Sequence, residues 1–233
     1  MLEFKKVSKN FGSIKALDDI SFKIKEGEFV FITGRSGAGK TTILRLVTRE
    51  VKASSGEIFL GEQELGSLKN KQIPHLRQQI GAIFQDFKLL PSKTIKENAE
   101  VALAIKGVDP KEWNERVEHV LNLVGLGERQ SLFPAQLSGG ELQRAAIARA
   151  LVINPDIVFA DEPTGNLDWA TTKSIVDLLD RISKEGKTVI VTTHNEDVVK
   201  KMGHRVIHLT DGKVDNDTGS QEPEIAKKTK NKK

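Results

Sequence analysis

Short apolar runs alternate along this chain with stretches in which apolar residues recur at three- and four-residue spacing. The length of the runs and the turn residues beside them predict buried strands, at residues 28–33, 80–84, 156–160 and 187–193. Helical spacing is found at residues 43–47, 138–153 and 170–184. Buried strands that alternate with helices predict an α/β fold.

The two ends of the chain add strands of their own. Residues 2–8 and 20–25 alternate apolar and polar side chains, which predicts two half-buried strands joined by a turn at residues 10–13. Residues 56–61 predict a further strand that ends in a turn, and residues 204–209 predict the last one. We therefore expect extra strands beside the alternating strands and helices.

The middle of the chain is helical throughout. From residue 92 to 126 the spacing stays at three and four, with a break at residues 107–110. This block predicts a helical subdomain, about residues 86–137, inserted into the α/β unit. The whole domain is expected to span residues 1–214, because residues 215–233 are polar and lysine-rich without periodicity, as in a disordered tail.

Composition narrows the class of protein. The 233 residues are 38% hydrophobic and 29% charged and include no cysteine, so disulfides and thiolate metal sites are excluded. No run of 18 apolar residues is present, so another chain would have to hold this one at a membrane. Of the net charge of +4, the five Lys and two Glu of residues 221–233 account for +3, so the folded part does not point to nucleic acid.

The strongest motif follows the first buried strand. It reads G-x-x-x-x-G-K-T, and it is followed by Thr42; its residues are Gly34, Arg35, Ser36, Gly37, Ala38, Gly39, Lys40 and Thr41. The glycines let backbone N–H groups close around phosphates at a helix start. Lys40 would reach the β- and γ-phosphates, and Thr41 would bind Mg²⁺ through its hydroxyl. The alternative is a glycine-rich turn that only begins a helix.

A second helix start has a similar character. Ser138 is a good N-cap, and Glu141 stands three residues later as in a capping box. Between them Gly139 and Gly140 leave the backbone bare, so that an anionic phosphate can approach. The alternative is a well-capped helix and nothing more.

Polar residues also follow the buried strands. Asp161 and Glu162 are adjacent carboxylates, whose repulsion a cation such as Mg²⁺ would relieve. Asp161 would hold the metal through water, and Glu162 would orient or polarise the hydrolytic water. Gln85 is placed to touch Mg²⁺ or that water, and His194 to bond the γ-phosphate, although each is compatible with an ordinary solvated or structural role.

In this order the motifs resemble the nucleotide-binding subunit of ATP-binding-cassette (ABC) systems. The resemblance spans residues 1–214 and rests on the phosphate loop, Gln85, the L-S-G-G-E sequence of residues 137–141, the Asp161-Glu162 pair, Asp168 and His194. It implies a P-loop nucleoside triphosphatase cassette with a RecA-like core, an N-terminal antiparallel β subdomain and an inserted helical subdomain. Its cofactors would be ATP and Mg²⁺, and its activity the hydrolysis of ATP to ADP and phosphate.

The resemblance also implies partners. In the family the L-S-G-G-E sequence contacts the ATP held by a second cassette, so an ATP-dependent head-to-tail homodimer is expected. Asp168 would lie at the dimer contact. Phe11 would stack on the base where most members have Tyr, and it lacks only the hydroxyl group of Tyr. Ordinary packing is the alternative for this ring.

Within the family the closest resemblance is to the cell-division branch. It rests on residues 87–90, 133–138 and 161–168, the last of which is shared with lipoprotein-release and macrolide-export ATPases. It implies an integral membrane subunit that docks near residues 85–105, a place at the cytoplasmic face of the bacterial membrane, and control of cell-wall hydrolases. The tail would be either a solvated end or a weak attraction to anionic lipid.

Other functions are possible for such a motif set. True export of a lipoprotein or drug would differ in the membrane partner. A soluble cassette associated with nucleic acid or ribosomes is disfavoured, because those usually have two cassettes or a long coiled-coil insertion. A scaffold without hydrolysis is disfavoured because every residue that the chemistry needs is present.

Overall fold

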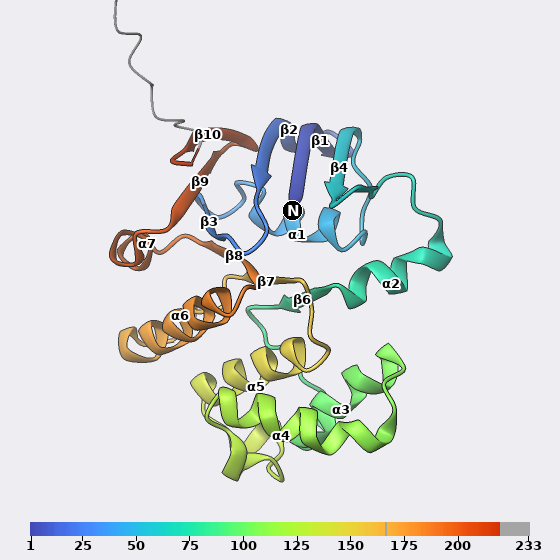
Figure 1. The fold of residues 1–233 in the computed structure, drawn as a ribbon. Helices are drawn as coiled ribbons and strands as arrows, with labels where there is room; N and C mark the ends of the chain where they lie inside the picture. Colours follow the sequence, from blue (N-terminus) through green and yellow to red (C-terminus); the bar gives the residue numbers. More distant parts are fainter. Residues whose placement is uncertain (166, 220–233) are drawn as a thin grey trace, which may run out of the picture.

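The computed structural model describes residues 1–165 and 167–219. Two sheets lie in the upper part of Figure 1, and a group of helices lies below them. The smaller sheet is antiparallel in the order β2-β1-β4-β5, with β1 (Leu2–Phe11), β2 (Ile14–Ile24), β4 (Ser55–Leu60) and β5 (Gln63–Glu64).

The larger sheet has the order β10-β9-β3-β8-β7-β6 and is parallel apart from β10. Its strands are β3 (Phe29–Thr33), β6 (Ile80–Ile83), β7 (Ile157–Asp161), β8 (Thr188–Thr193), β9 (Arg205–Thr210) and β10 (Lys213–Asp217). Every residue of β3, β7 and β8 is buried, which explains why these strands are apolar runs without alternation. Because they are parallel neighbours, their carboxyl ends meet at one edge, where ligands of α/β sheets collect.

Helices cover the larger sheet. The α-helices are α1 (Lys40–Val47), α2 (Ile73–Gln78), α3 (Ile95–Lys106), α4 (Trp113–Leu123), α5 (Gly139–Leu151), α6 (Trp169–Lys184) and α7 (Glu196–Met202). Short 3₁₀ turns lie at Asn70–Gln72, Pro110–Glu112, Gly127–Arg129 and Pro134–Gln136. None of the helices in the described part of the chain is both long and apolar enough to cross a bilayer.

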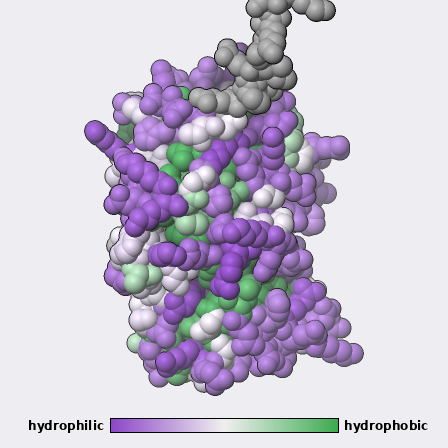
Figure 2. Space-filling model, turned by 60° about the vertical axis from the view of Figure 1, so that its left-hand side comes forward, coloured by the Kyte–Doolittle hydropathy of each residue, from purple (hydrophilic) through white to green (hydrophobic). Residues whose placement is uncertain are grey.

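The hydrophobic core divides at the larger sheet. Phe29 and Phe31 of β3 belong to the cluster that contains residues of α3, α4, α5 and α6. Val30 and Ile32 point the other way, into the cluster that contains α1 and the antiparallel sheet. Figure 2 shows the result on one face, where hydrophilic side chains dominate and apolar ones emerge only in patches between them. The sheet is therefore clamped on both faces, and its carboxyl edge is held in a rigid frame.

The structure differs from the sequence prediction in several places. The first turn is shorter than residues 10–13, because β1 runs to Phe11, which pairs with Ile14. The chain expected to be a tail from residue 215 begins with β10 instead, and residues 220–233 lie outside the described part. Only Val214 in β10 is apolar, so the strand has no pattern of its own; its ladder with β9 and the ion pair between Arg205 and Asp217 (2.7 Å) hold it.

Two further differences concern helices. The α5 helix ends at Leu151, two residues before the predicted end, and Asn154 has a left-handed φ of 49° ahead of Pro155. The α2 helix was not predicted, because only Ile73 and Leu76 are apolar in its six residues.

The inserted helical block with its break at Gly107 is confirmed by α3 and α4, which Gly107 separates with a φ of 77°.

Candidate functional site

The phosphate loop joins β3 to α1, as the motif requires. Gly39 has a φ of 104°, and a Cβ atom on it would lie 2.6 Å from the Ala16 carbonyl oxygen. On Gly34, with a φ of 149°, a Cβ atom would lie 2.5 Å from the Leu209 carbonyl oxygen. Only glycine fits at either place. Gly39 is also the N-cap of α1, where no side chain caps the first amides, so these N–H groups are free of a side-chain acceptor and suit an anion.

Lys40 is the cation of this loop, and it is buried. Its side chain donates to the carbonyl oxygens of Gly34 (2.8 Å) and Arg35 (3.2 Å). The Nζ atom lies 3.1 Å from Oε1 of Glu162. With 6% of its surface exposed, the ammonium depends on these three oxygens for compensation.

Glu162 is the centre of the site. Its Oε1 faces Lys40, while its Oε2 lies 2.9 Å from Nδ1 of His194. The Glu162 backbone has a left-handed φ of 47°, a conformation that costs roughly 1–3 kcal/mol in a non-glycine residue. Its N–H is held by the carbonyl oxygen (3.1 Å) and the hydroxyl (3.0 Å) of Thr192. The ends of three neighbouring strands thus bring Lys40 and His194 into contact with Glu162.

Asp161 directly precedes Glu162 and is buried. Its Oδ1 accepts a hydrogen bond of 2.5 Å from the Thr192 hydroxyl, and Thr41 is exposed at the start of α1. In the ranges that the structure describes, no three His, Asp or Glu side chains gather as a protein-only metal site. Mg²⁺ is usually held by one or two protein oxygens together with phosphate and water, so Thr41 and Asp161 fit this ion.

Gln85 reaches the same edge of the sheet. It is exposed and lies two residues beyond the end of β6. Its Nε2 would lie 3.0 Å from a Cβ atom built on Gly165, so its amide lies against the loop that follows Glu162. The structure therefore places Gln85 beside the loop that follows the two carboxylates.

Phe11 ends β1 and is 36% exposed. Lys9 Nζ lies 4.7 Å and the Arg45 guanidinium carbon 5.4 Å from the centre of its ring. Both are cation–π distances. The ring is accessible, and two cations that the sequence did not suggest lie beside it.

Ser138 begins α5 with the predicted capping box. The Glu141 N–H donates to Ser138 Oγ (3.4 Å), and the Ser138 N–H and hydroxyl donate to Glu141 Oε2 (2.9 and 2.7 Å). The hydrogen bonds from Ser138 lower the pKa of Glu141 below its ordinary value, and the bond from the Ser138 N–H contributes most. Gly140 is buried against Thr171 of α6, where a Cβ atom would lie 2.5 Å from Thr171 Cγ2, while Gly139 is exposed.

Asp168 begins α6 in the same manner. Its Oδ1 accepts a hydrogen bond from the Thr171 N–H (3.0 Å) and its Oδ2 accepts one from the Thr171 hydroxyl (2.5 Å). These bonds lower the pKa of Asp168, and the bond from the hydroxyl contributes most. Across residues 1–165 and 167–219, no hydrogen bond or ion pair joins residues 138–141 or Asp168 to residues 34–42. The two candidate phosphate sites are separate within one chain.

Thr192 is a residue of the site to which the sequence analysis gave no role. Its hydroxyl and carbonyl oxygen hold both Asp161 and Glu162 in place. The available signal was a hydroxyl residue at a fully buried position of a strand.

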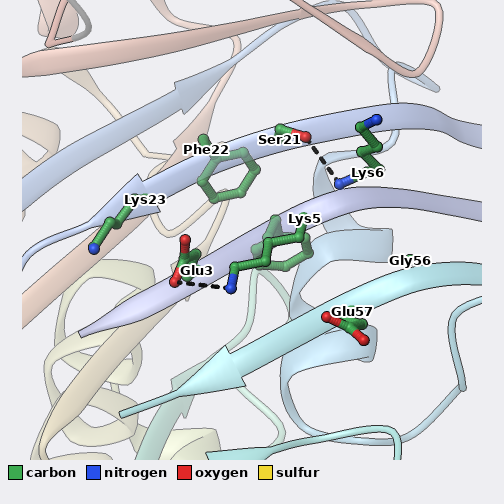
Figure 3. A pocket seen from close by; sticks show the side chains of 9 residues that line it. Glu3, Lys5, Lys6, Ser21, Phe22, Lys23, Gly56 and Glu57 are labelled. Atoms are coloured by element: carbon green, nitrogen blue, oxygen red, sulfur yellow. Dashed lines mark hydrogen bonds and ion pairs between the residues drawn. The ribbon is translucent and has the colours of Figure 1, made fainter. Parts of the chain in front are cut away.

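A surface hollow of about 930 Å³ lies elsewhere, on the antiparallel sheet. Figure 3 shows Lys5, Phe22, Lys23 and Glu57 among the side chains that line it. None of its lining residues belongs to the predicted nucleotide site, so it is a separate surface feature.

Known proteins show the same organisation. A family model described as ABC transporter matches residues 17–165. The cell division ATP-binding protein FtsE of Bacillus subtilis (strain 168) is 47% identical over 213 residues, 91% of this chain and 93% of that protein. The protein of the same name in Escherichia coli (strain K12) is 40% identical over 95% of this chain and 100% of its own. The ATP-binding cassette MJ0796, a dimer bound to ADP and Pi in a post-hydrolysis state, has a TM-score of 0.84 and 38% identity, covering 93% of this chain and 97% of that one.

These similarities confirm the resemblance predicted from the motifs, including its cell-division branch. They also confirm the fold class, because the dimeric cassette superposes over nearly the whole chain. The matched region contains the phosphate loop and both carboxylates. The chain therefore belongs to the ABC transporter family, as one of its ATP-binding and ATP-hydrolysing cassettes.

Proposed function

We propose that this chain is the ATPase subunit of a cell-division complex of the FtsE type, in which ATP-driven closure of two cassettes works an FtsX-like membrane subunit. The observation that supports it best is the position of Glu162. Its carboxylate lies between the phosphate-loop lysine and His194, at 3.1 and 2.9 Å. A base that orients water must lie within hydrogen-bond reach of the place where the phosphate is bound.

In this proposal each polar side chain has one task. Glu162 orients and polarises the hydrolytic water. Lys40 gives up its ion pair with Glu162 and binds the β- and γ-phosphates instead. His194 keeps its bond to Glu162 and senses the γ-phosphate through its other nitrogen. Phe11 stacks on the base.

The metal would be held by few protein atoms. Thr41 and Gln85 offer side-chain oxygens, and Asp161 acts through water. Mg²⁺ supplies charge neutralisation at the transferred phosphate when bound. Because the Thr192 hydroxyl already holds Asp161 at 2.5 Å, the Asp161 carboxylate needs little reorganisation to bind the water ligands of the metal.

The dimer follows from the separation of the two phosphate sites. If residues 34–42 hold one nucleotide and residues 138–141 contact another, one copy contains only half of each site. Two copies related by a twofold axis complete both sites, with Asp168 at the contact. The membrane subunit would dock near residues 85–105, where Leu90 and Ile105 are exposed apolar side chains, and it would hold the cassette at the cytoplasmic face.

The test is the substitution Glu162→Gln. It should keep ATP binding and reduce turnover by about a hundredfold or more, because a positioned base contributes 10²–10⁴. Glu196→Gln removes an exposed carboxylate that pairs with Lys200 and serves as the control. Phosphate release and ATP binding are measured on both. Turnover at the parent rate by Glu162→Gln would contradict the proposed role of Glu162.

A second experiment separates cell division from export. Purification of the tagged chain from membranes should recover an FtsX-like subunit. Recovery of a lipoprotein-release or macrolide-export permease instead would favour the alternative branch, which shares the sequence of residues 161–168.

A further inference from the structure

The segment that follows Gln85 has an unusual backbone. Phe87 and Lys88 are consecutive, neither is glycine, and both have left-handed φ angles, 59° and 51°. Such a conformation costs roughly 1–3 kcal/mol per residue and persists only where the surroundings hold it. The turn lies between Gln85 and α3.

Arg149, near the end of α5, holds this turn. Its Nη2 donates to the Phe87 carbonyl oxygen (2.9 Å) and its Nη1 to the Lys88 carbonyl oxygen. Burial lowers the pKa of the Arg149 guanidinium, and no ion pair of the described residues includes it. A desolvated cation with carbonyl oxygens as partners is a poor source of stability by itself, which suggests that its position serves another purpose.

The far end of the segment is held by α3. Asn98 is 1% exposed; its Oδ1 accepts from the Leu90 N–H (2.8 Å), and its Nδ2 donates to the carbonyl oxygens of Lys93 (3.1 Å) and Thr94 (2.9 Å). Helices α5 and α3 thus fix residues 87–94 at both ends.

The near end of the segment leads to the site. The Gln85 amide lies against Gly165, whose N–H donates to the Glu162 carbonyl oxygen (3.2 Å). At its other end α5 begins with Ser138, so one helix of 13 residues joins the capped start to Arg149. A continuous series of contacts therefore connects Ser138, Arg149, Gln85 and Glu162.

We propose that Arg149 is a positioning residue that ties Gln85 to α5, so that engagement of Ser138 by the second copy's nucleotide sets the place of the Gln85 amide beside Glu162. This inference rests on the proposed function, because it assigns Gln85 to the reaction. Arg149 itself touches no nucleotide in this account. It transmits the position of one rigid element to another.

The first test is Arg149→Met, with Arg116→Met as the control. Arg116 is a partly exposed arginine of α4 that pairs with Glu112. Arg149→Met should lower kcat by about ten- to a hundredfold, the scale of a displacement of about 1 Å, and leave the KM for ATP unchanged, because the phosphate loop is untouched. Hydrogen exchange at residues 86–93 should become faster. A lower Tm with unchanged kcat would contradict the inference.

A double-mutant cycle with Gln85→Ala tests the route. If Arg149 acts through Gln85, its replacement should have little further effect in the Gln85→Ala background. Equal losses in both backgrounds would overturn the inference. If Gln85→Ala keeps full activity, both the proposed role of Gln85 and the inference about Arg149 are contradicted. If Gln85→Ala loses activity while Arg149→Met keeps it, only the inference about Arg149 is contradicted.

Arg149→Lys covers the case in which the Met variant does not fold. It keeps the positive charge but loses the planar pair of donors. We expect a smaller loss of kcat in the same direction, again removed by Gln85→Ala. The coupling between Arg149 and Gln85 would be contradicted if a soluble Arg149→Lys protein kept the kcat of the parent while hydrogen exchange at residues 86–93 became faster.

Discussion

The starts of α1 and α5 are the two places where this chain offers backbone amides to a phosphate, and they differ in what already occupies those amides. At α1 the N-cap is Gly39 and no side chain accepts from the first turn. At α5 Ser138 and Glu141 satisfy each other in a full capping box. The first start has no side-chain cap and has a buried lysine beside it, whereas the second has one amide capped by Ser138 and a carboxylate in its first turn.

This difference indicates a division of tasks. An open helix start next to a cation can bind an anion alone. A start that has one amide already capped and a negative charge in its first turn has a reduced attraction for phosphate. We therefore expect the α1 start to bind ATP in the single chain, and the α5 start to act only on a nucleotide that another copy holds in place.

The largest expected effect is at α1. Replacing Lys40 by Met removes the charge that faces the phosphates, and it should weaken ATP binding by about ten- to a hundredfold, the value of one or two charge-assisted hydrogen bonds. Calorimetric titration measures it. The control is Lys173→Met, which removes an exposed lysine paired with Asp177. Unchanged affinity in Lys40→Met would remove the distinction between the two helix starts.

A smaller and different effect is expected at α5. Ser138→Ala removes the N-cap and should lower stability by about 1 kcal/mol. ATP affinity of the single chain should be unchanged, while ATP-dependent association weakens. Thr94→Ala is the matched control, because Thr94 caps α3 in an equivalent box with Glu97; it should cost similar stability without affecting association. Equal association in the two variants would contradict the role given to Ser138.

The smallest effect concerns pH. The pKa of Glu141 is held below its ordinary value of 4.5, chiefly by the Ser138 N–H, and α1 has no acidic residue in its first turn. A lowered folded-state pKa means that the stabilisation is complete above the ordinary pKa and is lost as pH falls through the folded one. Unfolding between pH 6 and pH 3 should therefore show a weaker acid dependence in Glu141→Gln than in the parent. An identical acid dependence of unfolding in Glu141→Gln and the parent would contradict a stabilising contact between Ser138 and the Glu141 carboxylate.

Local patterns were enough to predict some of this site. The strand–loop–helix around Lys40, the capping box of Ser138 and Glu141, and the inserted helices are all short-range features, and the structure contains each of them. They depend on residues a few positions apart, where spacing and propensity determine the geometry.

The remaining features depend on contacts between residues far apart in the sequence, which local patterns could not predict. Glu162 meets Lys40 and His194 because β3, β8 and β7 are neighbours, which no local pattern reveals. Arg149 was overlooked for the same reason, since its carbonyl partners lie 61 and 62 residues away. Strand β10 has one apolar side chain and exists through pairing alone.

The measurement that bears most directly on the division of tasks is the mass of the Glu162→Gln protein in analytical ultracentrifugation. With saturating Mg-ATP it should double, while without nucleotide, or with Ser138→Arg added, it should remain that of one chain. A protein that binds ATP under these conditions and stays single, or that doubles equally with Ser138→Arg, would contradict a nucleotide site shared between two copies.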